Sequence, residues 1–325
     1  MNDQSPSPTA ANDSIVICIV VTYDPAQARL EQLLQSVVPQ VRQVILVDNG
    51  STLTCLAWLR RLTCPAISLI ELGSNRGIAA AQNAGLAEAR RAGCNHLLLL
   101  DHDSVPDPSM VAELLQAQAA LASRGARVAA LGPRYVDARQ NRNKPPPFIR
   151  IEGARLVRCT CPTADTVVEV DYLIASGSLI PLATLDVVGG MAEELFIDYV
   201  DIEWGLRARR LGYQSYGVCA AHMAHDLGET PVIFMGRSLP VHTPLRHYYL
   251  FRNAVWLYRS TAVPLQWKWA DGWRLLLKYG FYTMFAKPRL AHLGMMSRGI
   301  LDGLRGRLGP IDPVTASSIQ ETDNQ

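Results

Sequence analysis

The stretch LLLLDHDSVP, residues 97–106, joins an apolar run to an abrupt acidic end. Four consecutive leucines are typical of a buried strand, because a strand that is covered on both faces has no polar side. Such a strand has no reason of its own to end in carboxylates, yet Asp101 and Asp103 follow it directly, on either side of a histidine. Either these acids hold a ligand, or Asp103 or Asp107 caps the helix that comes next.

Apolar runs and helical patterns alternate upstream of this stretch. We expect strands at 15–22, 44–47, 67–71 and 96–100, with helices at 26–36, 54–62 and 77–92 between them. Strand–helix alternation with fully apolar strands predicts a parallel sheet that is covered by helices on both faces. The fold class expected for the first half of the chain is therefore α/β.

Polar residues gather where each expected strand ends. They are Thr22, Tyr23 and Asp24 after the first strand, Asp48 after the second, Asn75, Arg76 and Gly77 after the third, and Asp101 and Asp103 after the fourth. In open α/β sheets, ligands bind beyond the carboxyl ends of the strands. One polar cluster could simply start a helix, but four clusters at one edge indicate a shared binding site.

A carboxylate pair at a strand end is a common site for a hard cation. Oxygen ligands suit Mg²⁺ or Mn²⁺, and Mg²⁺ usually binds one or two carboxylates together with phosphates of a substrate. The acid pair therefore predicts a metal ion and a phosphorylated ligand. Phosphatases of the haloacid-dehalogenase type also carry an apolar strand that ends in DxD, but their motif lies near the N-terminus of the domain. Here it follows the fourth strand.

Two other classes of protein lack their marks in this sequence. An NAD-dependent dehydrogenase should carry GxGxxG after its first strand, and TYDPAQA at 22–28 contains no glycine. A nucleic-acid-binding module should carry basic residues interleaved with aromatic residues in a binding motif. We find no such motif and expect no nucleic-acid partner.

The second half of the chain is less regular. It begins with an irregular segment at 138–166, an expected strand at 167–173 and a tight loop at 176–178. A helix is expected within 196–212, and a segment with two histidines follows at 218–228. Asp201 lies where that helix should begin, and Leu206 and Leu211 share one of its faces. The seven cysteines are scattered and odd in number, which predicts free thiols in a reducing cytosol.

The formal net charge of +2 hides a basic C-terminal region. Residues 241–310 contain eleven Lys or Arg, two Asp or Glu, and four of the six tryptophans. Trp269, Trp273 and Leu276 follow helical spacing on one face, with Asp271 and Arg274 on another. Such helices can lie on an anionic membrane surface without spanning the membrane, although they could equally pack as a helical cap. No signal peptide is visible, and the apolar runs are too short for a membrane span.

Taken together, the motifs resemble those of family 2 glycosyltransferases, which are inverting enzymes of the glycosyltransferase-A fold. The matched stretches are IVVTYDP (19–25), ILVDNGS (45–51), NRGIAAAQNAG (75–85), LLLLDHDSVP (97–106) and FIDYVDIEWGLRARRLG (196–212). Within the family, HDLGE (225–229), RHYYLFRN (246–253) and DGLRGRLG (302–309) favour the rhamnosyltransferases of O-antigen and rhamnolipid synthesis. The resemblance implies a Rossmann-like nucleotide-binding half, a mixed central sheet and a C-terminal helical region.

The resemblance also implies roles for the residues at the strand ends. The base and ribose of a nucleotide would be contacted by Thr22, Tyr23, Asp24 and Asp48. Asn75 and Gly77 would bring backbone close to the nucleotide, and Arg76 would face phosphate or solvent. Asp101 would hold the ribose or a metal-bound water, and Asp103 would ligate the metal. For Asp48, the alternative is a turn in which its side chain binds the backbone that follows.

In the second half, the resemblance implies a second metal ligand, a further contact loop and a general base. His225 would be the metal ligand, with His222 as the alternative, and Ser176 and Gly177 would contact the acceptor or the diphosphate. Asp201 would be the base, kept ionised by the helix N-terminus, or it would be a helix N-cap. Asp198 and Glu203 are its acidic neighbours.

The expected organisation is a disordered head at 1–14, a catalytic domain at 15–240, a basic helical region at 241–310 and a tail at 311–325. Within the catalytic domain, residues 15–130 form the expected nucleotide-sugar half and residues 131–240 the acceptor half. The expected function is metal-dependent transfer of L-rhamnose from dTDP-L-rhamnose to a glycolipid or saccharide acceptor, in the cytoplasm and on the inner face of the membrane. UDP-galactose or UDP-glucose is the alternative donor, and a DxD phosphatase is a remote one.

Overall fold

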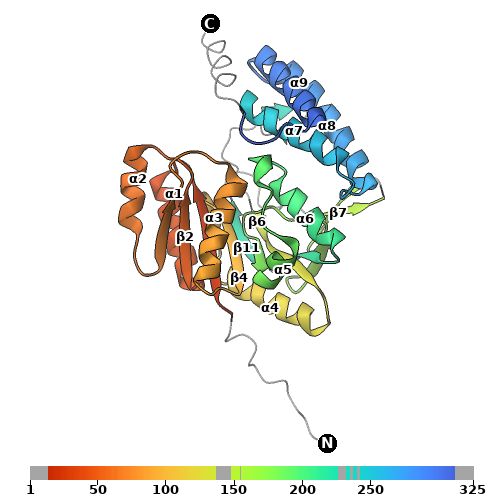
Figure 1. Cartoon of the computed structure of the whole chain (residues 1–325). Coiled ribbons are helices and arrows are strands. Elements are labelled where there is room, and N and C mark those ends of the chain that lie inside the picture. The colour runs from red at the N-terminus through yellow and green to blue at the C-terminus, as the bar shows by residue number, and fades with distance from the viewer. Residues whose placement is uncertain are drawn as a thin grey trace, which may run out of the picture.

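A computed structural model describes residues 14–136, 148–153, 155–225, 232–234, 237–239 and 242–311 (Figure 1). The expected head, the tail after residue 311, and the motif HDLGE beyond its histidine lie outside the described residues.

Four parallel strands form one half of the central sheet, as the apolar runs predict. They are β1 (Val16–Thr22), β2 (Gln43–Asp48), β3 (Ile67–Glu71) and β4 (His96–Asp101), in the spatial order β3-β2-β1-β4. All seven residues of β1 are buried, because helices cover both of its faces. Since the four strands are parallel, their carboxyl ends meet at one edge of the sheet.

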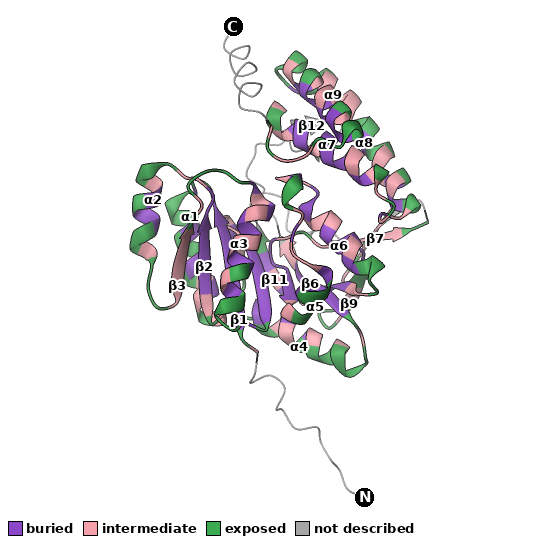
Figure 2. Cartoon of the chain, in the orientation of Figure 1, coloured by how far each residue is buried: buried purple, intermediate pink, exposed green. Residues whose placement is uncertain are grey.

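Alternate residues of β1 enter two separate cores. Val16, Cys18 and Val20 pack with α1 (Gln27–Val37), α2 (Leu53–Leu59) and α4 (Met110–Ser123), whereas Ile17, Ile19 and Val21 pack with α3 (Ile78–Arg91), α5 (Leu182–Val188) and α6 (Val200–Arg210). This period of two is the geometry of a strand between two helical layers. The purple strands of Figure 2 lie between these partly exposed helices.

The second half of the chain extends the same sheet with mixed strand directions. Its strands are β10 (Leu179–Pro181), β6 (Val128–Val136), β11 (Gln214–His225) and β5 (Ser104–Pro106), with β9 (Val167–Val170) beside β11. β10 runs antiparallel to both β4 and β6, while β6 and β11 are parallel. The expected mixed sheet is confirmed, although β9 is shorter than predicted. A separate hairpin pairs β7 (Phe148–Glu152) with β8 (Arg155–Cys159), and a second pairs β12 (Val232–Phe234) with β13 (Arg237–Leu239).

The helix that follows the acid pair does not use an aspartate as its cap. The N-cap of α4 is Ser109, without a side-chain cap hydrogen bond. The alternative in which Asp103 or Asp107 caps this helix is therefore wrong.

The prediction of free cysteines is wrong for two of the seven. Cys161 and Cys219 form a disulfide, with their Cα atoms 5.6 Å apart, and the other five cysteines are free. Cys219 lies in β11, and its backbone amide donates a hydrogen bond to the carbonyl of Thr166. This pairing of β11 with the segment before β9 brings together two cysteines that are 58 residues apart, which their spacing along the chain does not reveal.

Three helices form the basic C-terminal region and pack on α6. They are α7 (Pro244–Arg259), α8 (Leu265–Phe285) and α9 (Arg289–Arg305), and α8 ends before Pro288 as expected for a helix-breaking residue. Leu206 of α6 shares a core with Phe251, Trp267 and Met296 of these helices. Figure 1 shows the three helices as a layer on one side of the catalytic sheet.

Helix α9 lies unusually close to α7 because glycines face α7. A Cβ atom at Gly299 would lie 2.4 Å from the Tyr248 carbonyl oxygen, and one at Gly303 would lie 2.5 Å from that of Arg252. Only glycine allows the two backbones to approach in this way. The motifs RHYYLFRN and DGLRGRLG are therefore in contact with each other.

The face of α8 that carries Trp269, Trp273 and Leu276 is exposed, with 74%, 62% and 61% of these residues accessible. The opposite side of the same helix buries Trp267, Leu275 and Tyr282. Asp271 does not belong to a solvated polar face as predicted, because its carboxylate accepts hydrogen bonds from the hydroxyls of Tyr199 and Tyr258 at 2.9 and 2.6 Å. Within the described residues, no helix is both long enough and apolar enough to cross a membrane.

Candidate active site

The loops after β1 and β2 are joined by side chains that were predicted to share a site. The Asp24 amide donates to Ser51 Oγ at 2.9 Å. The Asp24 carboxylate accepts from the amide and the hydroxyl of Thr52 at 2.9 and 2.8 Å. Asp24 itself has a positive φ of 42°. These contacts hold Asp24 at the edge of the sheet, next to an exposed Tyr23.

Asp48 is buried at the end of β2, and its carboxylate organises the turn that follows. One oxygen accepts from the amides of Gly50 and Ser51 at 3.2 and 3.1 Å, and the other from Thr22 Oγ1 at 3.4 Å. The turn considered as an alternative is therefore present. The three hydrogen bonds do not use every acceptor position of the Asp48 carboxylate, because two oxygens offer about four. A contact between Asp48 and a nucleotide base stays a prediction.

The loop after β3 is fixed by a pair of asparagines. Asn75 Oδ1 accepts from Asn49 Nδ2 at 3.1 Å and from the Gly77 amide at 3.0 Å, and Asn49 Oδ1 accepts from the Arg76 amide at 2.8 Å. Arg76 is exposed. Residues at the ends of the second and third strands thus form one hydrogen-bond network.

Gly77 allows a close approach, but to the protein itself. Its φ is 87°, and a Cβ atom there would lie 2.5 Å from the Phe196 carbonyl oxygen. The same carbonyl accepts a hydrogen bond from the Ile78 amide at 2.7 Å. The glycine therefore joins the first half of the chain to the segment before α6, which its position in the sequence did not indicate.

The loop at 176–178 is hydrogen-bonded to the end of β4, where the acid pair begins. Ser176 is buried; its hydroxyl accepts from the Asp101 amide at 3.0 Å and is hydrogen-bonded to Ser104 Oγ at 2.7 Å. The Gly177 amide donates to the Leu99 carbonyl at 2.7 Å. The loop therefore contacts β4 and the residues on either side of the acid pair through Ser176 and Gly177. In this structure they hold the acidic loop in place, and a contact with acceptor or diphosphate stays a prediction.

Strand pairing places His225 nearer to the acid pair than His222. His225 is opposite Ser104 in the β5–β11 ladder, whereas the His222 carbonyl binds the Asp107 amide. The His225 side chain is outside what the structure describes. Among the described residues, no group of three or more His, Cys, Asp or Glu is arranged to hold a metal. The half-buried Asp101 and Asp103 nevertheless fit a cation that takes its other ligands from a phosphorylated substrate.

Asp201 lies in the first turn of α6 and is half-buried. The N-cap position belongs to Tyr199, so the alternative in which Asp201 is the cap is wrong. Burial, and then the nearby Asp198 and Asp101 carboxylates, raise the pKa of Asp201 to about 6. The helix N-terminus therefore does not lower the pKa of this carboxyl below its ordinary value, and a pKa near 6 suits a general base. Asp201 lines a pocket together with Leu99 of β4 and Ser178, close to the strand end that carries Asp101.

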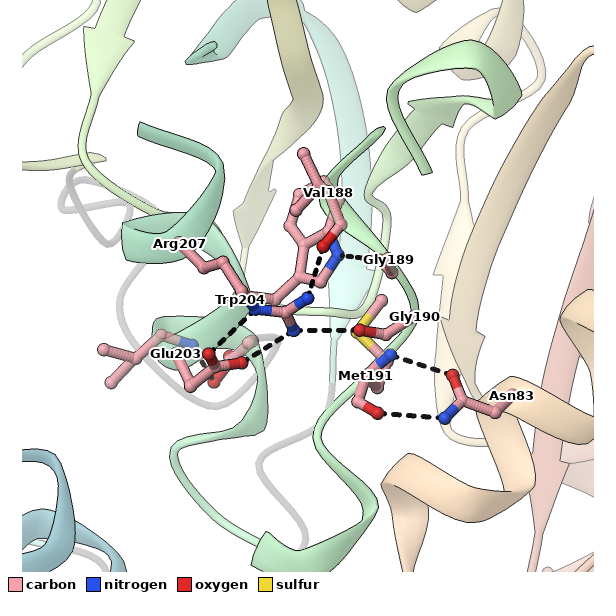
Figure 3. Close-up of polar contacts among 10 residues, drawn as sticks. Asn83, Val188, Gly189, Gly190, Met191, Glu203, Trp204 and Arg207 are labelled. Atoms are coloured by element: carbon pink, nitrogen blue, oxygen red, sulfur yellow. Dashed lines mark hydrogen bonds and ion pairs between the residues drawn. The ribbon is translucent and has the colours of Figure 1, made fainter. Parts of the chain in front are cut away.

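The two neighbouring acids have cationic partners. Glu203 forms a two-point ion pair with Arg207, at 2.9 and 2.8 Å, and the same guanidinium donates to the carbonyls of Val188 and Gly190 at 2.6 and 2.8 Å (Figure 3). Asp198 lies 3.4 Å from Arg246 of α7. Glu203 therefore has a structural role in joining α6 to the loop after α5.

Two residues that hold this site were missed by sequence reasoning. Arg252 and Asn253 in RHYYLFRN are fully buried, and they bind carbonyls of the segment that precedes Asp201. The available signal was a pair of polar residues inside an otherwise aromatic helix, since buried polar groups need partners.

Comparisons with known proteins match the sequence to a family and to a relative. The family model for glycosyl transferase family 2 matches residues 17–165. The dTDP-rhamnosyl transferase RfbF of Shigella flexneri is 30% identical over 297 residues, which cover 91% of this chain and 98% of RfbF.

Two solved structures share the fold at low identity. GalNAc-T7 with UDP, GalNAc and Mn²⁺ matches 91% of this chain and 56% of its own, with a TM-score of 0.56 and 11% identity. S. aureus TarS 1-349 with UDP-GlcNAc matches 90% of this chain and 81% of its own, with a TM-score of 0.52 and 16% identity. The expected glycosyltransferase-A fold is confirmed.

The raised pKa of Asp201 predicts how stability depends on pH. The ordinary pKa is 3.8 and the folded one is about 6, so the folded state binds the proton more tightly. Stability is therefore lost as pH rises between these two values, and the loss persists above them. We expect Asp201→Asn to stabilise the fold at pH 7.5 by roughly 1–3 kcal/mol and to give no gain at pH 4.

Thermal unfolding at the two pH values measures this. Glu203→Gln is the matched control from the same end of α6, and it should give no gain because it removes the partner of Arg207. An Asp201→Asn variant that is less stable than the natural protein at pH 7.5 would contradict the prediction.

Proposed function

The chain belongs to glycosyltransferase family 2, and we propose that it transfers L-rhamnose from dTDP-L-rhamnose to a hydroxyl of a glycolipid or saccharide acceptor. The observation that carries the donor is the 30% identity to a dTDP-rhamnosyl transferase, which extends over nearly the full length of both chains. Membership of a transferase family also removes the phosphatase alternative. UDP-galactose and UDP-glucose are the donors to test against dTDP-L-rhamnose.

The loops at the strand ends would bind the donor nucleotide. Tyr23, Asp24 and Asp48 would face its base and ribose, and the loop at 75–77 would approach the phosphates. Asp103, with His225 as the second ligand, would hold Mg²⁺ or Mn²⁺. When bound, the cation stabilises negative charge on the leaving diphosphate.

Asp201 would act as the general base in this transfer. The acceptor oxygen forms a bond to the anomeric carbon while the bond from that carbon to the diphosphate oxygen breaks, and the hydroxyl proton passes to Asp201. The transition state resembles an oxocarbenium ion. Because the base and the leaving group lie on opposite sides of the sugar, the configuration inverts. The position of Asp201 near Asp101 supports this role.

A donor screen tests the substrate and the metal together. Release of nucleoside diphosphate is measured with dTDP-L-rhamnose, UDP-galactose and UDP-glucose, each with Mg²⁺, with Mn²⁺ and after chelation. We expect turnover of dTDP-L-rhamnose that is abolished by chelation. Asp103→Ala should lose the response to metal, whereas Asp107→Ala, an exposed acid four residues later, should keep it. Preferred turnover of a UDP-sugar would refute the donor assignment.

The base is tested by its pH profile. Because the ionised form must accept the proton, kcat should fall as pH drops below about 6. Asp201→Asn should lower kcat by ~10²–10⁴-fold at neutral pH, while donor binding persists. Glu203→Gln serves as the control for a neighbouring acid with a structural partner. Near-normal turnover by a folded Asp201→Asn enzyme would exclude Asp201 as the base.

We further propose that the enzyme works in the cytoplasm, peripherally on the inner face of the membrane. The exposed α8 face with Trp269, Trp273 and Leu276 supports this. Tryptophan side chains with so much exposed surface favour the interface between membrane and water. Arg274, Lys287 and Arg289 are exposed in the same region and would attract anionic headgroups.

Liposome co-sedimentation tests the surface. We expect binding to vesicles with anionic lipid and much weaker binding to zwitterionic vesicles. Replacing both Trp269 and Trp273 by Ser should reduce binding at least tenfold. Leu53→Ser removes an equally exposed apolar side chain from α2 and should have no effect. Equal binding of the double variant and the natural protein would contradict the assignment of this face.

A further inference from the structure

The backbone directly before the proposed base adopts an unfavourable conformation. Phe196, Asp198 and Tyr199 have φ angles of 66°, 63° and 64°. Side chains other than glycine rarely adopt this region, and such residues persist only where their surroundings hold them. Because α6 begins at Val200, this segment determines where the helix begins and where Asp201 lies.

Asn253 holds this segment from the adjacent helix α7. Its Nδ2 group donates to the carbonyls of Leu195, Ile197 and Asp198 at 2.9, 2.8 and 2.9 Å. Two N–H groups thus serve three carbonyls. Its Oδ1 accepts from Arg252 Nε at 2.9 Å, which fixes which way the amide points. The side chain is completely buried, so water does not replace these bonds.

Arg252 binds the same segment and also binds Gly309, near the end of the described chain. Its Nη2 atom donates to the carbonyls of Leu195 and Glu194 at 2.9 and 3.3 Å, and its Nη1 atom donates to the carbonyl of Gly309. The Gly309 amide in turn donates to the Glu194 carbonyl at 2.7 Å. The planar guanidinium can serve several carbonyls at once, which a lysine ammonium cannot do in the same geometry.

Another contact from α7, and one from the first half of the chain, also hold the segment. The Phe196 ring stacks on Tyr249 of α7 at 4.8 Å between centroids. The Phe196 carbonyl binds the Ile78 amide of the nucleotide half. Any shift of α7 would therefore move the segment relative to the rest of the site.

We propose that Arg252 and Asn253 are positioning residues that hold the 194–198 backbone so that Asp201, in the first turn of α6, faces the pocket that it lines with Leu99 and Ser178. The inference rests on the proposed role of Asp201 as the base. Neither residue touches the reacting atoms, because both are buried in α7 and act through the backbone that they bind.

Loss of this contact has a kinetic signature that a loss of stability alone does not produce. Once released, the segment relaxes to ordinary backbone angles, and Asp201 becomes more hydrated and more distant from Asp101. Both changes lower its pKa, because burial and nearby carboxylates are what raise it. The acidic limb of the kcat profile then moves to lower pH while kcat falls.

The test compares Asn253→Ala and Arg252→Lys with Tyr279→Phe. The control removes the hydrogen bond between Tyr279 and Ser297 at 2.8 Å, which joins α8 to α9, and leaves the bonds of Arg252 and Asn253 in place. We expect the first two variants to lower kcat by about 10–100-fold, to move the acidic limb below pH 6 and to keep donor Kd within about twofold. Hydrogen exchange at 194–200 should accelerate. Tyr279→Phe should lower the unfolding temperature and leave kcat and the acidic limb unchanged.

Two results would overturn the inference and can be told apart. If Asp201→Asn abolishes turnover but a folded Arg252→Lys or Asn253→Ala enzyme keeps the natural kcat and acidic limb, the positioning role is wrong and the base stands. If Asp201→Asn is fully active, the base is wrong and the inference falls with it. Arg252→Lys keeps the buried charge, so it provides the test even where Asn253→Ala does not fold.

Discussion

Buried peptide groups must find hydrogen-bond partners, and the segment between residues 194 and 198 has neither a long helix nor a sheet to provide them. Asn253 and Arg252 supply the missing donors from α7. The same segment binds Ile78 of α3 and Gly309 near the end of the described chain. One set of buried hydrogen bonds therefore connects the start of α3, the start of α6 and the C-terminal helices. This explains why the basic helical region packs against the rest of the described chain.

The charge state of Asp201 shows which of two opposing effects is larger. A helix N-terminus favours a carboxylate by about 0.3–1 kcal/mol. The rise in pKa from 3.8 to about 6 corresponds to roughly 3 kcal/mol in the opposite direction. Burial and the nearby acids therefore outweigh the helix dipole. A carboxylate with this pKa is still ionised at neutral pH, and it holds a proton more firmly than an ordinary aspartate does.

Local patterns in the sequence predicted the features that depend on local physics. The four parallel strands and the shared edge follow from continuous apolar runs such as Leu97–Leu100 and from where polar residues interrupt them. The features that sequence reasoning did not find are contacts between distant segments. Gly77 faces Phe196, Ser176 lies under the acidic loop, Asp271 binds two tyrosines, and Cys161 meets Cys219. Each of these requires knowing which strands or helices are neighbours, and a single sequence does not encode that in its spacing.

The three acids in FIDYVDIE illustrate how packing assigns roles that residue type leaves open. Glu203 is matched by Arg207, whose remaining donors bind backbone carbonyls, so a proton on Glu203 would leave a guanidinium without its counter-charge. Asp198 faces Arg246 and carries a strained backbone. Within the described residues, Asp201 forms no ion pair, and its carboxylate accepts a hydrogen bond from the Ile202 amide at 2.9 Å. Protonation of Asp201 therefore relieves repulsion from Asp198 and Asp101 and breaks no ion pair. Of the three acids, it is the one that can take up and release a proton without disturbing the helix that carries it.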